Sequence, residues 1–195
     1  IPNSVTSIGY DAFYYCSGLT KVNYLGTVNK WAKIDFNGAS ANPTYYAKKL
    51  YINDELLTNV KITEAKSIKD YAFYNCQSIK SVEIGNGVTS IGRIAFSSCA
   101  SLANVTIPST VTSIDELAFY GCQSLAEVTS LATTPPALGG SVFTDIASPA
   151  TLYVPTGCAP TYKASDWAQY FSTIKGEGDP ENPGIYNLDD LLAFR

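Results

Sequence analysis

Cysteine thiols and acidic side chains are the groups in this chain whose types could support chemistry. Cys16, Cys76, Cys99 and Cys122 each stand three residues after a phenylalanine. Histidine is absent, so neither Ser–His nor Cys–His nucleophile pairs can form, and no C-x-x-C pair indicates zinc. We expect these four thiols to be reduced and buried as small apolar groups. Cys158 lies outside the series, so an odd thiol remains free in a monomer.

The carboxylates do not form a catalytic pattern. Asp115-Glu116 and Asp189-Asp190 are adjacent pairs. A glycosidase needs two carboxyl groups facing each other across a cleft, roughly 5–10 Å apart, and neighbours on one surface turn do not meet that need. We therefore expect solvated surface acids, no catalytic residue, no metal ligand and no cofactor. The sequence predicts that the chain is not an enzyme.

Composition excludes further classes of function. The net charge is -4 and charged residues make up 15% of the chain, which argues against a nucleic-acid partner because phosphate binding needs clustered cations. No apolar run approaches the roughly 20 residues that cross a bilayer, so membrane insertion is not predicted. The chain begins at Ile1 without a methionine, and we expect it to be a piece of a longer protein.

A repeat positions the cysteines. Copies start at Ile8, Ile68, Ile91 and Ile114, and in each one Phe, Cys, Leu or Ile, and Val follow at offsets of 5, 8, 11 and 14. The last three starts are 23 residues apart, and a degenerate copy begins at Leu138. One such unit cannot bury its apolar face alone, so the copies must stack as a solenoid.

Each repeat has a readable local pattern. In one copy, Ala95, Phe96, Cys99 and Leu102 are spaced by three or four, which favours a short helical turn with these side chains inward. The segment 105–107 then alternates with period two, as expected of a strand that ends before a proline. The fold class predicted is an α/β solenoid with one short strand and one short helical turn per repeat.

The remaining segments interrupt or end the repeats. Residues 25–62 read as one diverged repeat plus an insertion, with a hairpin turning at residues 53–55. Residues 155–175 are expected to form a helical C-terminal cap, with Ser165 capping a second short helix. Residues 176–184 have the composition of a linker, and residues 185–195 read as the first helix of a truncated following domain.

Two surfaces are candidates for binding. Tyr14, Tyr74 and Tyr120 follow the repeated phenylalanine and are expected to stack in a line, either packing together or forming an aromatic binding stripe. The other surface is the outward row of the strands, which is either merely soluble or a binding face. The partner-facing residues proposed there are Asn23, Glu83, Asn104, Thr106, Glu127, Thr129 and Tyr153.

The extended repeat pattern resembles a known family. Residues 102–107 match the leucine-rich-repeat core L-x-x-L-x-L. The longer pattern I-P-x-x-V-T-S-I-x-x-x-A-F-x-x-C-x-S-L-x-x-V, present from Ile107 to Val128 and less completely from Ile1 to Val22, resembles the BspA-like subfamily of bacterial surface leucine-rich repeats. The resemblance covers roughly residues 1–175, including the variant segment around Trp31 and the cap around Trp167.

The resemblance carries functional expectations. It implies an extracellular or cell-surface location, no catalytic residues, and adhesion to host proteins or to neighbouring cells. The leading hypothesis is a monomeric interaction module that binds a protein, or alternatively a glycan, through a repeat face. The second hypothesis is a carbohydrate-binding or spacer region of a secreted multidomain enzyme.

Overall fold

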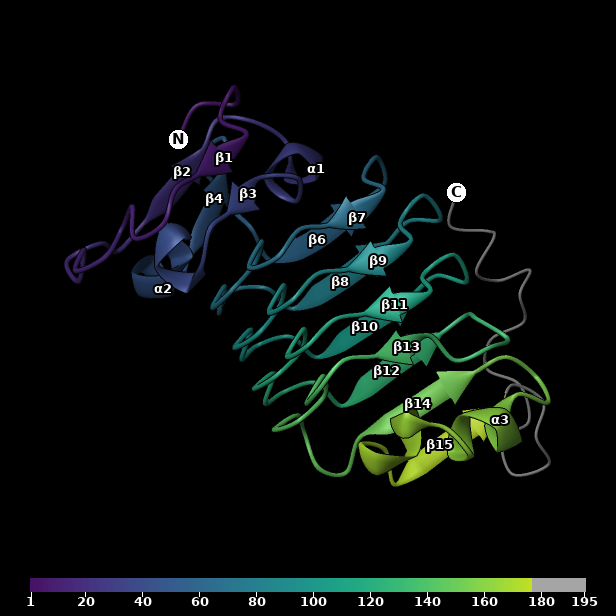
Figure 1. Cartoon of the computed structure of the whole chain (residues 1–195). Helices are drawn as coiled ribbons and strands as arrows, with labels where there is room; N and C mark the ends of the chain where they lie inside the picture. The colour runs from purple at the N-terminus through teal and green to yellow at the C-terminus, as the bar shows by residue number, and fades with distance from the viewer. Residues whose placement is uncertain (177–195) are drawn as a thin grey trace.

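Two parallel strand ladders run along the chain in the computed structural model, which describes residues 1–176. The longer ladder has six strands, in the order β15-β14-β12-β10-β8-β6. In chain order these are β6 (Asn59–Ile62), β8 (Ser81–Ile84), β10 (Asn104–Ile107), β12 (Glu127–Ser130), β14 (Thr151–Val154) and β15 (Thr173–Gly176). Figure 1 shows these strands stacked one above another, so that successive repeats form a solenoid.

The second ladder is shorter and carries the lead isoleucines. Its four strands are β7 (Ser67–Ile68), β9 (Ser90–Ile91), β11 (Ser113–Ile114) and β13 (Ala137–Leu138), paired in parallel. Ile68, Ile91 and Ile114 occupy the same register position, which confirms the 23-residue spacing as one turn of the solenoid. β10 ends at Ile107, directly before Pro108, as the sequence predicted.

The connections between the two ladders are turns, and the expected helix in each repeat is absent from these connections. Ile94 and Ser98 have φ values of 58° and 60°, a left-handed conformation that breaks the helical hydrogen-bond pattern. Their N–H groups instead bond to the next turn, and Phe96 N likewise donates to Ala118 O at 2.8 Å. The same two positions are left-handed in five turns: Asp11 and Tyr15, Tyr71 and Asn75, Ile94 and Ser98, Leu117 and Gly121, and Ser141 and Asp145.

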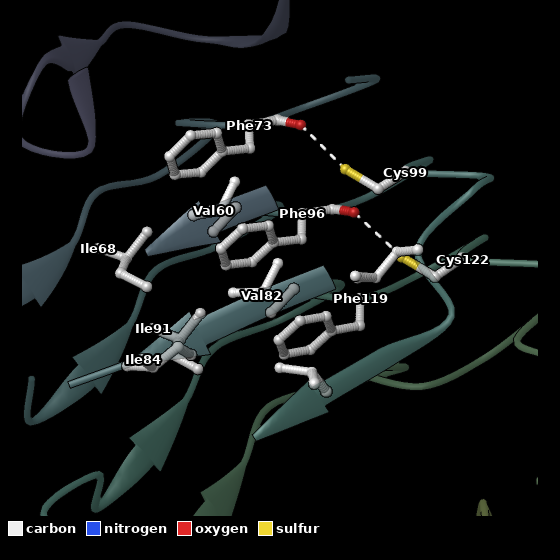
Figure 2. Close-up of a cluster of buried hydrophobic side chains, with 14 of the residues drawn as sticks. Val60, Ile68, Phe73, Val82, Ile84, Ile91, Phe96, Cys99, Phe119 and Cys122 are labelled. Atoms are coloured by element: carbon white, nitrogen blue, oxygen red, sulfur yellow. Dashed lines mark hydrogen bonds between the residues drawn. The ribbon is translucent and has the colours of Figure 1, made fainter. Parts of the chain in front are cut away.

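Aligned side chains from successive turns fill the core. The rings of Phe73, Phe96, Phe119 and Phe143 stack with centroids 5.1, 5.3 and 5.4 Å apart and interplanar angles of 4–5°, and Figure 2 shows three of them in line. All four rings are at most 2% exposed. The stacking confirms the predicted register, because offset-stacked rings appear only when equivalent residues meet.

The N-terminal part forms separate, shorter ladders. β1 (Ser7–Ile8) pairs with β3 (Asp35–Phe36), and β2 (Val22–Tyr24) pairs with β4 (Leu50–Ile52), both in parallel. β4 then turns back into β5 (Glu55–Leu56), which confirms the hairpin predicted at residues 53–55. The remaining elements of this part are α1 (Val28–Trp31), η1 (Ala39–Ala41) and α2 (Thr44–Ala47).

Side chains join the diverged repeat to the regular solenoid. Trp31 Nε1 donates to Ala72 O at 2.6 Å, and Asn42 Nδ2 donates to Tyr71 O at 2.7 Å. Thr44 Oγ1 donates to Tyr74 O at 2.6 Å. Elsewhere main-chain N–H groups of the preceding turn satisfy such carbonyls. The diverged repeat therefore replaces part of the backbone ladder with buried polar side chains, which must be paired when water is excluded.

The C-terminal cap is helical only in part. α3 (Ala159–Lys163) and the 3-10 helix η2 (Asp166–Gln169) cover the last turn, and the Ser165 side chain accepts from Trp167 N as predicted. The chain then adds β15, a strand not foreseen, which pairs with β14. This strand extends to Gly176, so the expected boundary at residue 175 falls inside it. The expected linker from residue 177 and the expected helix at 185–195 lie outside the described residues.

Within residues 1–176, none of the helices has the length and apolar character needed to cross a bilayer. This finding agrees with the expectation of no membrane insertion in this part of the chain.

Candidate functional site

The outward side of the longer ladder is a regular array of side chains. Alternate residues of each strand point away from the core, because successive side chains of a strand lie on opposite faces. The strand register aligns them in two rows, which we call the strand face. One row is Lys61, Glu83, Thr106, Thr129, Tyr153 and Lys175, and the other is Asn59, Ser81, Asn104, Glu127, Thr151 and Thr173.

The structure brings together six of the seven residues proposed to face a partner. Thr106 and Thr129 are register partners, and so are Asn104 and Glu127. Glu83 and Tyr153 lie one strand further out on either side of the threonines. Sequence analysis missed Lys61 and Lys175, because they belong to β6 and to β15, which fall in the diverged repeat and in the cap.

Asn23 is the predicted residue that does not join the others. It lies on β2, in the ladder with β4, and pairs with Tyr51. Its side chain donates to Asp54 Oδ1 at 2.9 Å and accepts from Asp54 N at 2.9 Å. Lys21 also contacts Asp54, at 3.3 Å. Asn23 therefore holds the β4–β5 hairpin and is separate from the strand face.

The strand face is polar and close to electrically neutral. Lys61 Nζ lies 3.0 Å from Glu83 Oε1, with both side chains about 60% exposed, so this ion pair contributes little stability. Glu127 and Lys175 add one charge of each sign, and Thr106, Thr129, Thr151 and Thr173 supply hydroxyl groups. Such a surface can form hydrogen bonds with a partner but has little long-range attraction for either sign of charge.

Three of the repeated cysteines are buried, as expected. Cys76, Cys99 and Cys122 are 0% exposed and unpaired. Cys99 Sγ donates to Phe73 O and Cys122 Sγ to Phe96 O, each at 3.2 Å, as Figure 2 shows. Burial raises the pKa of Cys76 and of Cys122 to about 12 and also raises the pKa of Cys99. These thiols are thus poor nucleophiles and poor metal ligands.

Cys16 corrects the expectation of four equivalent buried thiols, because its side chain is exposed. It belongs to the first turn, whose core side chains have no turn in front of them among the described residues. Ala12 is likewise exposed and Phe13 half-buried, whereas their equivalents Ala95 and Phe96 are 0% exposed. Position in the stack, and not the repeat pattern, decides the exposure of a thiol.

The predicted line of three stacked tyrosines is wrong. Tyr14 contacts Tyr15, with ring centroids 4.1 Å apart, and Tyr74 contacts Tyr45 at 5.9 Å. Tyr120 lies farther along the solenoid, where a hydrogen bond to Asp145 raises its pKa. The turn between Tyr74 and Tyr120 carries Ser97 at this position, and the diverged repeat lies between Tyr14 and Tyr74.

Catalytic groups do not converge in the described part of the chain. Asp115 and Glu116 are both exposed, and the Asp115 carboxylate accepts from the backbone N–H of Glu116 at 2.8 Å. No group of three or more Cys, Asp or Glu side chains within residues 1–176 could hold a metal ion. The prominent features are therefore surfaces, of the kind that bind macromolecules by extended contact.

Parallel ladders repeating every 23 residues around an aligned apolar core define a leucine-rich-repeat solenoid, a class that is typically non-catalytic and mediates protein interactions. The family model for the BspA type leucine-rich repeat region matches six copies, over residues 1–49 and 44–159. The chain belongs to this family, which confirms the resemblance noted in its sequence. Proteins with these repeats are typically secreted or attached to the cell surface.

A solved structure supports the fold. The crystal structure of a leucine-rich repeat protein from Bacteroides ovatus ATCC 8483 is 24% identical to this chain, with a TM-score of 0.52. The match covers 90% of this chain and 41% of that protein, so the chain spans less than half of its length. Among curated proteins, none matches.

Proposed function

We propose that this chain is an extracellular interaction module whose strand face binds a macromolecular partner in adhesion. The observation that carries the proposal is the register that aligns Asn104 with Glu127 and Thr106 with Thr129. Their side chains point outward from adjacent strands, and no hydrogen bond within residues 1–176 ties the side chains of Asn104, Thr106, Glu127 or Thr129 to the protein. They offer donors and acceptors to one continuous partner surface.

The partner proposed is a protein of the host or of a neighbouring cell. Flat, regular strand arrays suit such a partner because many weak contacts add over a broad area. The near neutrality of the strand face predicts that affinity changes little with salt. A monomer is the proposed state of the module.

The test is a pair of substitutions at the centre of the strand face. Thr106→Arg with Thr129→Arg places two bulky cations outward on adjacent strands, which should block a partner without disturbing the core. Binding of the purified chain to immobilised host matrix proteins and to a glycan array is measured with and without the change. The control is Ser109→Ala, an exposed position just beyond β10.

Loss of protein binding in the double variant, with an unchanged melting temperature, would support the strand face. Unaltered binding of a genuine protein partner would show that another surface is used. Binding to glycans in place of proteins would favour the second hypothesis, a carbohydrate-binding or spacer region in a secreted multidomain enzyme.

A further inference from the structure

A cluster of exposed aromatic rings lies at the corner of the first three turns, away from the strand face. Its members, which we call the tyrosine corner, are Tyr14, Tyr15, Tyr45, Tyr46 and Tyr74. Tyr14 is 52% exposed, Tyr15 79% and Tyr45 37%. Exposed large aromatic groups gathered in one place mark interaction sites, because burying them against a partner removes much apolar surface from water.

The polar groups of the tyrosine corner are largely used within the protein. Tyr15 N donates to the hydroxyl of Tyr46 at 3.2 Å, and Asn75 Nδ2 donates to Tyr45 O at 2.9 Å. A hydrogen bond with Tyr15 raises the pKa of Tyr14. The surface left for a partner therefore consists mainly of ring faces and edges, which favour an apolar ligand over one that depends on hydroxyl groups.

The spacing of the rings sets a repeat length. Tyr14 and Tyr15 belong to the first turn, Tyr45 and Tyr46 to the second, and Tyr74 to the third. Neighbouring turns are about 4.8 Å apart, so the first and third turns are about 9.6 Å apart. A polyproline II helix rises about 3.1 Å per residue with three residues per turn, and equivalent side chains recur every 9.3 Å or so.

One carboxylate lies at the edge of the tyrosine corner. Asp11 accepts a hydrogen bond from the Ser40 hydroxyl and lies close enough to Tyr14 to raise the pKa of that phenol. The three ion pairs found among residues 1–176 join Lys21 to Asp54, Lys61 to Glu83 and Lys69 to Asp35. Asp11 is therefore available to a cation on a bound ligand.

From these observations we infer that the tyrosine corner binds a proline-rich extended peptide that carries a basic residue. Prolines three apart would contact the rings of the first and third turns, with the second-turn tyrosines beneath the intervening residues. Aromatic surfaces recognise this conformation because it is preformed and loses little entropy on binding. The basic residue would pair with Asp11, which fixes the direction of the peptide.

The experiment measures fluorescence anisotropy of a labelled oligoproline peptide with one central arginine, titrated with the whole chain. Tyr14→Ser with Tyr15→Asn removes the two most exposed rings of the tyrosine corner, and asparagine suits the left-handed conformation of residue 15. We expect this variant to bind about tenfold more weakly or worse. The matched control is Thr106→Arg with Thr129→Arg, which should bind the peptide as the parent does.

Two further measurements keep the outcome decisive. Asp11→Asn should weaken binding of the arginine peptide and leave binding of an all-proline peptide unchanged. A peptide with glycine in place of each proline should not bind. The inference is overturned if the parent chain does not bind the proline peptide, if the tyrosine variant binds it equally well while keeping the parent melting temperature, or if soluble oligosaccharides compete for the same rings. Because the strand-face variant is tested separately, failure here leaves the proposed function untouched.

Discussion

The thiol of Cys99 donates to the carbonyl oxygen of Phe73, 3.2 Å away in the preceding turn. The same bond joins Cys122 to Phe96. A cysteine suits this slot because it is small, apolar and still able to donate a weak hydrogen bond to a buried carbonyl. The repeated cysteines are thus part of the bonding between turns, and their chemistry is suppressed by burial.

Thiol labelling should separate the cysteines into two groups. In the native protein, Cys76, Cys99 and Cys122 should resist a maleimide reagent, Cys16 should react quickly, and Cys158, which is half-buried, should react more slowly. All five should react in denaturant. Mass spectrometry of labelled peptides gives the answer, and rapid native labelling of Cys99 would contradict the packing described.

Alkaline pH should reduce the contribution of Cys122 to stability. Its folded-state pKa is raised to about 12 by burial, from an ordinary value of 9.0. Below pH 9 the thiol is protonated in both states, and its contribution is fully present. Between pH 9 and 12 only the unfolded chain releases the proton, so stability falls by up to about 1.4 kcal/mol per pH unit.

Urea unfolding of the parent and of Cys122→Ala at several pH values isolates this contribution from other titrating groups. The difference in free energy of unfolding between the two proteins should shrink above pH 9. A difference that stays constant up to pH 11 would show that the thiol is solvated.

Phe96→Ala should lower the free energy of unfolding by about 3–5 kcal/mol. The ring lies between Phe73 and Phe119 and is 0% exposed, so its removal leaves a cavity in the middle of the stack. Urea denaturation followed by circular dichroism measures the change, with Ser109→Ala as the surface control. A loss smaller than about 1 kcal/mol would be incompatible with the stacked register.

Gly121→Ala should destabilise the protein by about 1 kcal/mol through the backbone alone. Gly121 has φ +70°, and the nearest atom to an added methyl group would be Ser98 Oγ, at 3.6 Å, so space is available. Ser98 is the equivalent residue one turn earlier, with φ 60°, and Ser98→Gly should be stabilising. Thermal melts of both variants test the pair, and effects of equal sign would contradict the left-handed pattern.

Several features could be predicted from particular residues. The lead isoleucines and the phenylalanines recur every 23 residues, and side chains that must be buried at equal spacing can only meet by stacking. The strand that ends at Pro108 and the hairpin at residues 53–55 follow from local backbone chemistry. The outward position of Thr106 and Thr129 follows from the period of a strand.

Other features depended on contacts between distant residues. Ile94 adopts a left-handed conformation that a β-branched residue disfavours, because its N–H bonds to Glu116 O in the next turn. Cys16 and Cys99 share one sequence pattern, yet only Cys99 has a turn on each side. β15 became a strand because β14 presented an open edge, and Asn23 left the predicted row because Asp54 bonds to it.

The sequence by itself determined the repeat, its length and the inward side chains, since these are set by the spacing of apolar residues along the chain. Only the tertiary structure decided the shape of the turns, the members of the strand face and the gathering of five tyrosines at one corner. The physical reason is that hydrogen bonds between turns outweigh the local preferences of single residues, and those bonds exist only once the turns have stacked.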